Sequence, residues 1–154
     1  MPDCSVTRKS WGQLTTDDLY SFLKLRTDVF FVEQKVDEEE LDNRDREDAT
    51  EHYWMTDDSG TAAYLRVLHD AVPEHLDAHR IIGRVVVRAD RRGEGLAQQL
   101  IAAAIADFGD DAMMLHAQSY AASLYAKAGF VPFGDEFVEA GIIHTGMYRA
   151  APAV

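Results

Sequence analysis

Apolar residues recur along this chain with two different periods, and the period changes at residues typical of turns. Ser5–Trp11 reads as a short first strand. Thr15 and the acidic residues after it form a helix-capping signal, and apolar side chains then recur at helical spacing. This pattern predicts an amphipathic helix from Thr16 to about Val32. The polar stretch Asp37–Asp48 is expected to be a loop with space for one helical turn.

The middle of the chain predicts two paired strands followed by a buried one. His52–Thr56 and Thr61–His69 flank Asp57-Asp58-Ser59-Gly60, whose composition is typical of a hairpin turn. Arg80–Arg88 is rich in Ile and Val, as expected of a central strand buried on both faces. Gly83 interrupts that strand and is a candidate site for a bulge.

The last third of the chain predicts helices that alternate with strands. A helix begins near Gly95 and buries one apolar face. The strand–helix–strand passage should form a right-handed parallel crossover, and the hairpins on either side should be antiparallel. The remaining elements are expected as a strand, a helix and two strands, in this order: Met113–Ala117, Ser119–Ala128, Phe130–Phe133 and Ile142–Tyr148.

These elements together predict an α/β fold. Its sheet is mixed, mostly antiparallel and six- to seven-stranded, with a central parallel β-α-β crossover and helices on both faces. The sequence holds no repeat, low-complexity tract or linker, so residues 1–154 are expected to form a single domain.

Composition narrows the classes of function. A net charge of −12 argues against a nucleic-acid partner, because a phosphate backbone requires a basic surface. No apolar run approaches the ~20 residues of a membrane span. The N-terminus lacks the apolar core of a signal peptide, so we expect a cytoplasmic protein with no membrane partner. The single Cys4 excludes an internal disulfide and is a poor candidate nucleophile, and no Cys/His spacing suggests a metal.

Charge is distributed unevenly along the chain. Asp37–Asp48 contains eight acidic residues and two arginines. Arg80–Arg92 contains five arginines and one acidic residue, Asp90. A local cationic patch on an acidic protein predicts that a small anionic ligand docks there.

The most informative motif is Arg92-Gly93-Glu94-Gly95-Leu96-Ala97, directly after a predicted buried strand and at the start of a helix. Helix N-termini expose free N–H groups, and glycines let a phosphate approach the backbone. A plain strand-to-helix turn is the alternative interpretation. A P-loop would need a Lys after the second glycine, and a dinucleotide fingerprint would need a Gly or Ala where Gln98 stands.

This motif carries a family resemblance. Arg92-x-x-Gly95-x-Ala97 after a valine-rich strand resembles the acetyl-CoA signature of the GNAT N-acetyltransferases, and the element order resembles their fold along nearly the whole chain. Leu124–Phe130 resembles the second landmark of that family, Leu-Tyr-x-x-x-Gly-Phe. Arg26–Gln34 and Ile143–Met147 resemble the ElaA subfamily.

The resemblance implies a site for acetyl-CoA as co-substrate, without a metal. The main chain of the fourth strand would bind the acetyl carbonyl and the pantetheine arm, which would enter where the fourth and fifth strands splay. Gln118 would contact the pantetheine, or alternatively cap the next helix. The residues assigned to acetyl-CoA in this way are Val85, Val86, Val87, Arg92, Gly93, Glu94, Gly95, Leu96, Ala97, Gln118 and Tyr125.

The resemblance also implies catalytic roles. Tyr125 would protonate the departing thiolate, and its alternative role is a core tyrosine. Glu33 and His144 are rival general bases, and each has an equally weighted structural alternative. The acceptor side would comprise Phe30, Glu33, Gln34 and His144, whereas His52 and His116 are expected to be structural.

The implied function is direct transfer of an acetyl group from acetyl-CoA to an amine, by a monomer or a homodimer. Asp37–Asp48 is either a solvated segment or a rim of the acceptor site that favours cationic amines. Two alternatives of another class remain: a non-catalytic acyl-CoA-binding module and a nucleotide-binding protein. The identity of the amine does not follow from the fold.

Overall fold

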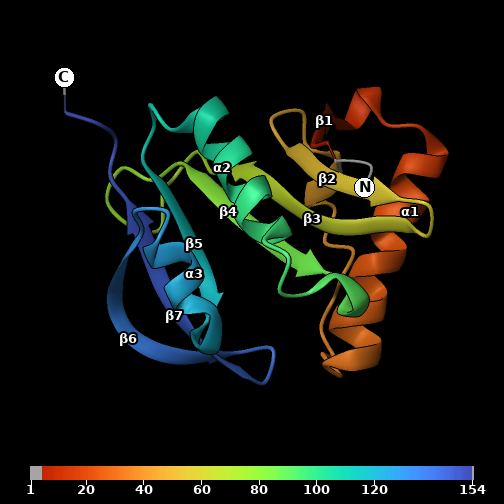
Figure 1. Cartoon of the computed structure of the whole chain (residues 1–154). Coiled ribbons are helices and arrows are strands. Elements are labelled where there is room, and N and C mark those ends of the chain that lie inside the picture. Colours follow the sequence, from red (N-terminus) through yellow and green to blue (C-terminus); the bar gives the residue numbers. More distant parts are fainter. Residues whose placement is uncertain (1–4, 154) are drawn as a thin grey trace.

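A computed structural model describes residues 5–153, so Cys4 lies outside the described residues. The chain forms one seven-stranded sheet in the order β1-β2-β3-β4-β5-β7-β6 (Figure 1), which confirms the predicted mixed sheet. Its strands are β1 (Thr7–Ser10), β2 (Glu51–Asp57), β3 (Gly60–His69), β4 (Arg80–Val87), β5 (Met113–Gln118), β6 (Val131–Glu139) and β7 (Ile142–Arg149).

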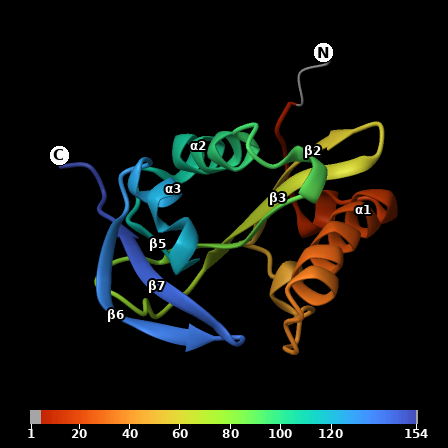
Figure 2. The same cartoon turned by 60° about the horizontal axis from the view of Figure 1, so that its bottom comes forward.

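Helices cover both faces of this sheet, as predicted (Figure 2). α1 and the segment that continues it lie on one face, and α2 and α3 lie on the other. No described helix combines the length and apolar character needed to span a membrane. The helices are α1 (Thr16–Arg26), α2 (Leu96–Phe108) and α3 (Ala122–Ala126), with a π-helical segment η2 (Thr27–Glu33) and short 3₁₀ turns at Trp11–Gln13, Arg44–Arg46, Ala89–Arg91 and Ser119–Ala121.

The first helix begins where the capping signal predicts. The Thr15 hydroxyl accepts a hydrogen bond from the N–H of Asp18, and the Asp18 carboxylate accepts one from the N–H of Thr15. From Thr27 onward the helix continues in the π form up to Glu33. The predicted helix therefore has the right length, but its last two turns are wound more widely than an α-helix.

Two packed cores hold the helices on the sheet. On one face, Leu100, Ile101 and Ala104 of α2 pack against buried strand residues such as Leu65 and Leu115. On the other face, Phe22, Leu25 and Val29 pack against Trp54 and Tyr64. Tyr53 and Trp54 illustrate the alternation that divides the cores, because neighbouring residues of a strand point to opposite faces.

The strands β4 and β5 are the parallel pair, and they separate soon after they meet. Their register runs only from Arg80–Ile82 against Met113–Leu115. β4 then bulges: Arg66 of β3 faces Gly83 and Tyr64 faces Val86, with a register shift between them. The bulge lies where Gly83 predicted it, but the residue with the left-handed backbone is Arg84, with φ 53°.

The prediction that β4 is buried on both faces is wrong. Only Ile82 and Val86 are fully buried in this strand. The remaining positions are partly exposed, and from Gly83 onward β5 no longer pairs with this strand. Two boundaries at the C-terminal end also differ. β6 continues past Phe133 to Glu139 through an irregularity around Gly134, and the last predicted helix is split into a 3₁₀ turn and α3.

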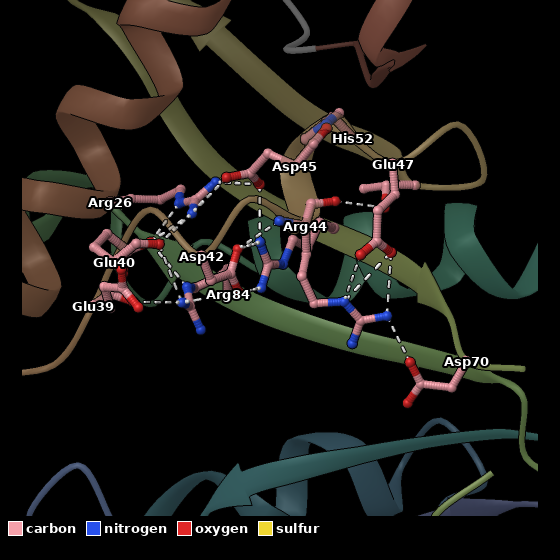
Figure 3. Close-up of polar contacts among 12 residues, drawn as sticks. Arg26, Glu39, Glu40, Asp42, Arg44, Asp45, Glu47, His52, Asp70 and Arg84 are labelled. Carbon is pink, nitrogen blue, oxygen red and sulfur yellow. Dashed lines mark hydrogen bonds and ion pairs between the residues drawn. The ribbon is translucent and has the colours of Figure 1, made fainter. Parts of the chain in front are cut away.

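The acidic stretch Asp37–Asp48 is not a solvated loop throughout. Asp45 is 5% exposed and pairs with Arg26, which is fully buried (Figure 3). Arg66, also buried, pairs with both Asp42 and Asp45. Glu40 forms ion pairs with Arg26 and Arg84. Arginines distant in sequence therefore hold this segment on the sheet, which its composition alone did not reveal.

Candidate active site

A cleft of about 920 Å³ opens where β4 and β5 separate. Its walls come from η2, the acidic segment, β4 with the turn after it, β5, α3 and the β6–β7 hairpin. Every residue that the sequence predicted for the site lines this cleft except Glu94, whose side chain pairs with Arg91. The predicted donor and acceptor residues therefore share one continuous cavity.

The glycine motif forms the turn that leads into α2. Gly93 and Gly95 have φ values of 82° and 81°, a left-handed conformation that favours glycine. Gly95 is the N-cap of α2, and no side chain caps the first turn of the helix. A Cβ atom placed on Gly93 would have no neighbour within 4 Å, so the space above the turn is open. This arrangement suits an anion such as a phosphate.

The predicted cationic patch is neutralised by acidic partners. Each of its five arginines takes part in an ion pair, because the fold brings carboxylates from other segments next to them. The pairs are Arg80–Asp111, Arg84–Glu40, Arg88–Asp57, Arg91–Asp57 and Arg92–Glu33. Among these carboxylates, only Glu33 belongs to the predicted site.

The pair between Arg92 and Glu33 joins the two sides of the cleft mouth. The guanidinium donates two hydrogen bonds to the carboxylate, at 2.7 and 2.8 Å. Both side chains are 43% exposed, so the pair is open to solvent. Its hydrogen bonds hold the pKa of Glu33 below the usual value. A carboxylate stabilised in this way is a poor general base, which weakens that role for Glu33.

A second contact crosses the cleft one residue further along. The side-chain amides of Gln34 and Gln118 bond reciprocally, with N···O distances of 3.0 and 3.3 Å. Gln34 follows the end of η2 and Gln118 ends β5. The structure thus brings together a predicted acceptor-side residue and a predicted pantetheine contact.

Tyr125 lies in the cleft wall with only 6% of its surface exposed. Burial raises the pKa of its phenol, so the hydroxyl keeps its proton at neutral pH. Phe130 packs edge-on against its ring. No other described residue forms a hydrogen bond with the hydroxyl, which leaves it available to a ligand.

His144 faces the cleft from β7 and is 7% exposed. Its Nδ1 lies 2.7 Å from the carbonyl oxygen of Ile142 and must donate to it, since a carbonyl only accepts. In the neutral ring, Nε2 is then an unprotonated acceptor. His144 is paired with Gln118 across the sheet, so both side chains project from the same face.

The two histidines predicted to be structural have different surroundings. His52 is fully buried between the Tyr64 hydroxyl and the carbonyl of Asp45, and burial lowers its pKa. His116 lines the cleft and contacts Glu139 at 3.1 Å and Glu74 at 2.7 Å. These bonds, that to Glu139 above all, raise the pKa of His116 to about 9.

Glu139 is a cleft residue that the sequence reasoning missed. It ends β6, beside the turn into β7, and its Oε2 lies 3.8 Å from Nε2 of His144. Only the pairing of β6 with β7 reveals this proximity, and the predicted strand ended six residues earlier, at Phe133. Among residues 5–153, no three His, Cys, Asp or Glu side chains form a group that could hold a metal ion.

Comparison with known proteins agrees with this architecture. A UPF0039 protein of Mycobacterium tuberculosis is 40% identical over 146 residues, which covers 92% of this chain and 91% of that protein. A crystal structure described as an acyl-CoA N-acyltransferase from Pseudomonas aeruginosa superposes with a TM-score of 0.85 at 38% identity, covering 96% of this chain and 99% of that one. Escherichia coli ElaA superposes with the same TM-score at 29% identity, covering 95% and 99%.

This architecture therefore places the chain in the class of acyltransferases. The family profile described as "Acetyltransferase (GNAT) domain" matches residues 19–150. This chain belongs to the GNAT acetyltransferase family.

Proposed function

We propose that this protein transfers an acetyl group from acetyl-CoA to a primary amine by direct attack within a ternary complex. The observation that carries the proposal is a single cleft. One wall of this cleft contains the N-terminus of α2, which no side chain caps and which glycines leave open to a ligand. The other walls contain Tyr125 and His144, which could give and take protons. No covalent enzyme intermediate is required.

On the donor side, the separation of β4 from β5 supports a main-chain binding site. Beyond Ile82, the edge of β4 that faces β5 has no strand partner. Val86 packs under α1 and Val85 and Val87 pack toward α2, so the ligand would contact these residues through their backbone. Unpaired N–H and C=O groups of this kind suit the amides of a pantetheine arm. The amides of Gly93–Ala97, with Arg92 beside them, would receive the pyrophosphate.

On the acceptor side, His144 is the better candidate base. Its Nε2 is free to take a proton, whereas Glu33 is held ionised by Arg92. Tyr125 would donate its proton to the sulfur as coenzyme A leaves. Phe30 and Gln34 would border the amine. We also propose, from composition, that the protein works in the cytoplasm, as a monomer or a homodimer.

The test is release of free thiol from acetyl-CoA in the presence of a panel of amines, including polyamines, amino acids and peptides. We expect at least one primary amine to stimulate release, with the acetylated amine confirmed by mass spectrometry. A thermal-shift comparison covers the alternatives, because a ligand that binds only the native state raises the melting temperature. Stabilisation by ATP or NAD but not by acetyl-CoA would indicate a nucleotide-binding protein. Stabilisation by acetyl-CoA without turnover would indicate a non-catalytic module.

A further inference from the structure

We infer that Glu139 and His144 together form the seat for the acceptor, and that the acceptor binds there as a primary ammonium ion. This inference rests on the proposed function and adds to it the protonation state of the substrate and a second binding residue. Both side chains line the cleft, on the strands that follow the donor site.

The two residues present two acceptors and no donor to the same point. In its neutral form, His144 directs its only N–H at the Ile142 carbonyl, which leaves the lone pair of Nε2 toward Glu139. Glu139 uses one oxygen, Oε1, for His116. Its other oxygen, Oε2, lies 3.8 Å from Nε2 of His144, too far for a hydrogen bond between them.

This spacing fits one nitrogen that donates twice. A nitrogen about 2.9 Å from each acceptor would subtend roughly 80° between them, so both hydrogen bonds would bend only modestly from a tetrahedral ammonium. A hydroxyl has one proton to donate and can satisfy only one of the two acceptors. A carboxylate placed here would meet Glu139 and be repelled. The geometry therefore selects a nitrogen with at least two N–H groups, and the negative charge of Glu139 favours its ammonium form.

The surroundings keep Glu139 ionised for this task. A hydrogen bond from His116 lowers the pKa of Glu139, and the charges of His116 and Arg84 act in the same direction. On its outer side His116 is held by Glu74. The ring of Phe137 contacts both histidines, with centroid distances of 4.9 Å to His116 and 6.0 Å to His144. Glu139 thus remains a carboxylate while His144 exchanges protons.

Acetyl transfer from this bound ammonium involves two proton losses from the nitrogen. The ammonium passes one proton to Nε2 of His144 and becomes a neutral amine, still held by an N–H bond to Glu139. Its lone pair forms the N–C bond, and the C–S bond breaks with its electron pair on sulfur. Tyr125 protonates the sulfur, and the second proton lost by the nitrogen restores the tyrosine. His144 then returns its proton to solvent, so the net reaction releases one proton.

The experiment measures binding directly. The full chain, labelled with ¹⁵N-histidine and saturated with coenzyme A, is titrated with n-butylammonium chloride while the Nε2 resonance of His144 is followed by NMR. We expect a saturable, millimolar shift, and no such shift with n-butanol of the same length. Glu139→Gln should weaken the binding at least fivefold, and Glu139→Asp should lose less.

Glu136→Gln is the matched control, because Glu136 lies on the same strand, is exposed and does not line the cleft. It should bind as the wild type does. The inference is overturned by an unshifted His144 in the wild type, by an equal response to n-butanol, or by unchanged affinity in a folded Glu139→Gln variant. Fold is checked by the unchanged His52 resonances.

Turnover separates this inference from the proposed function. With a reactive amine, Glu139→Gln should raise the KM of the amine about tenfold and leave the KM of acetyl-CoA within twofold. Saturable ammonium binding without any thiol release would contradict the proposed acetyl transfer and support the ammonium site at Glu139 and His144. Turnover with unchanged kinetic constants in Glu139→Gln would support the acetyl transfer and contradict the ammonium site.

Discussion

At the scale of single residues, the two side chains that we propose to transfer protons are both buried. Tyr125 is almost completely enclosed, and its hydroxyl has no hydrogen-bond partner among the described residues. This hydroxyl is not among the buried side-chain polar atoms without a partner, so it reaches the solvent in the cleft, where a ligand can meet it. His144 is almost as enclosed, yet one ring nitrogen is satisfied by Ile142 and the other is left open.

Tyr125→Phe removes this hydroxyl alone. We expect kcat to fall by about 100-fold or more, since general acid catalysis contributes at least that much. The affinity for coenzyme A should stay within twofold. Thiol release and isothermal titration calorimetry measure the two quantities. Tyr20→Phe, at an exposed position of α1, is the control and should behave as the wild type. Undiminished turnover would remove Tyr125 from the mechanism.

At the scale of elements, the end of η2 and the glycine turn contact each other across the cleft through Glu33 and Arg92. The wide winding of η2 ends at Glu33, and Lys35 then takes a left-handed conformation with φ 58°. Consecutive residues at this end reach the opposite wall, Glu33 to Arg92 and Gln34 to Gln118. The π-helical winding, which is frequent at functional sites, therefore ends where Glu33 and Gln34 line the cleft.

Glu33→Gln should tighten coenzyme A binding two- to fivefold at low salt, because Arg92 no longer divides its charge between a carboxylate and the pyrophosphate. Arg92→Gln should weaken binding by a larger factor. Calorimetry at two salt concentrations gives both values, with Asp28→Asn of η2 as a control that leaves binding unchanged. If Arg92→Gln weakens coenzyme A binding but Glu33→Gln leaves it unchanged, Glu33 and the pyrophosphate do not compete for Arg92.

Gly95→Ala tests the turn itself. A residue with a Cβ atom in the left-handed conformation costs about 1–2 kcal/mol, so urea unfolding should show a loss of that size. Coenzyme A should also bind more weakly, because the methyl group stands at the open start of α2. Gly12→Ala is the matched control: it has neither a positive φ nor a neighbour within 4 Å of the added atom. Equal stability of the two variants would contradict this account.

At the scale of the whole molecule, a partly buried ionic network joins the acidic segment to α1, β3 and β4. Three arginines face three carboxylates in it, so its charges balance. The groups are Arg26, Arg66, Arg84, Glu40, Asp42 and Asp45. Because Glu40 and Asp42 also line the cleft, the network sets one wall of the site.

Asp45→Asn should destabilise the protein by about 3 kcal/mol at pH 7, because Arg26 and Arg66 would be left as buried charges without their shared partner. Urea unfolding followed by circular dichroism measures this loss. Asp28→Asn breaks an exposed pair with Lys24 and should cause no measurable change. A loss as small as that of the control would show that the network contributes little.

The same network predicts how stability depends on pH. Burial alone would raise the pKa values of Asp42 and Asp45, but hydrogen bonds and charges from the arginines outweigh it and lower both. Carboxyl groups with a lowered folded-state pKa stabilise the fold above the unfolded value of about 3.9, and that stability is lost as the pH falls below it. The wild type should therefore lose stability steeply below about pH 4, and Asp45→Asn should lose less.

The order of elements, the mixed sheet and the glycine turn could all be predicted from the sequence, because each depends on residues close together in the chain. Apolar periodicity indicates the elements, and Gly93 and Gly95 indicate a left-handed turn before a helix. The resemblance to GNAT proteins then named residues that do share one cleft. Their chemical roles stay predictions.

The ionic partners were decided by the tertiary structure alone. Arg92 pairs with Glu33, Arg26 pairs with Asp45, and Glu139 lies near His144. These contacts exist only because strand register and helix packing bring distant segments together. A charge in a sequence shows neither its burial nor its partner, and these two properties determine whether it binds a phosphate, holds a wall or receives a proton. Long-range contacts therefore decided which of the predicted charges remain free for chemistry.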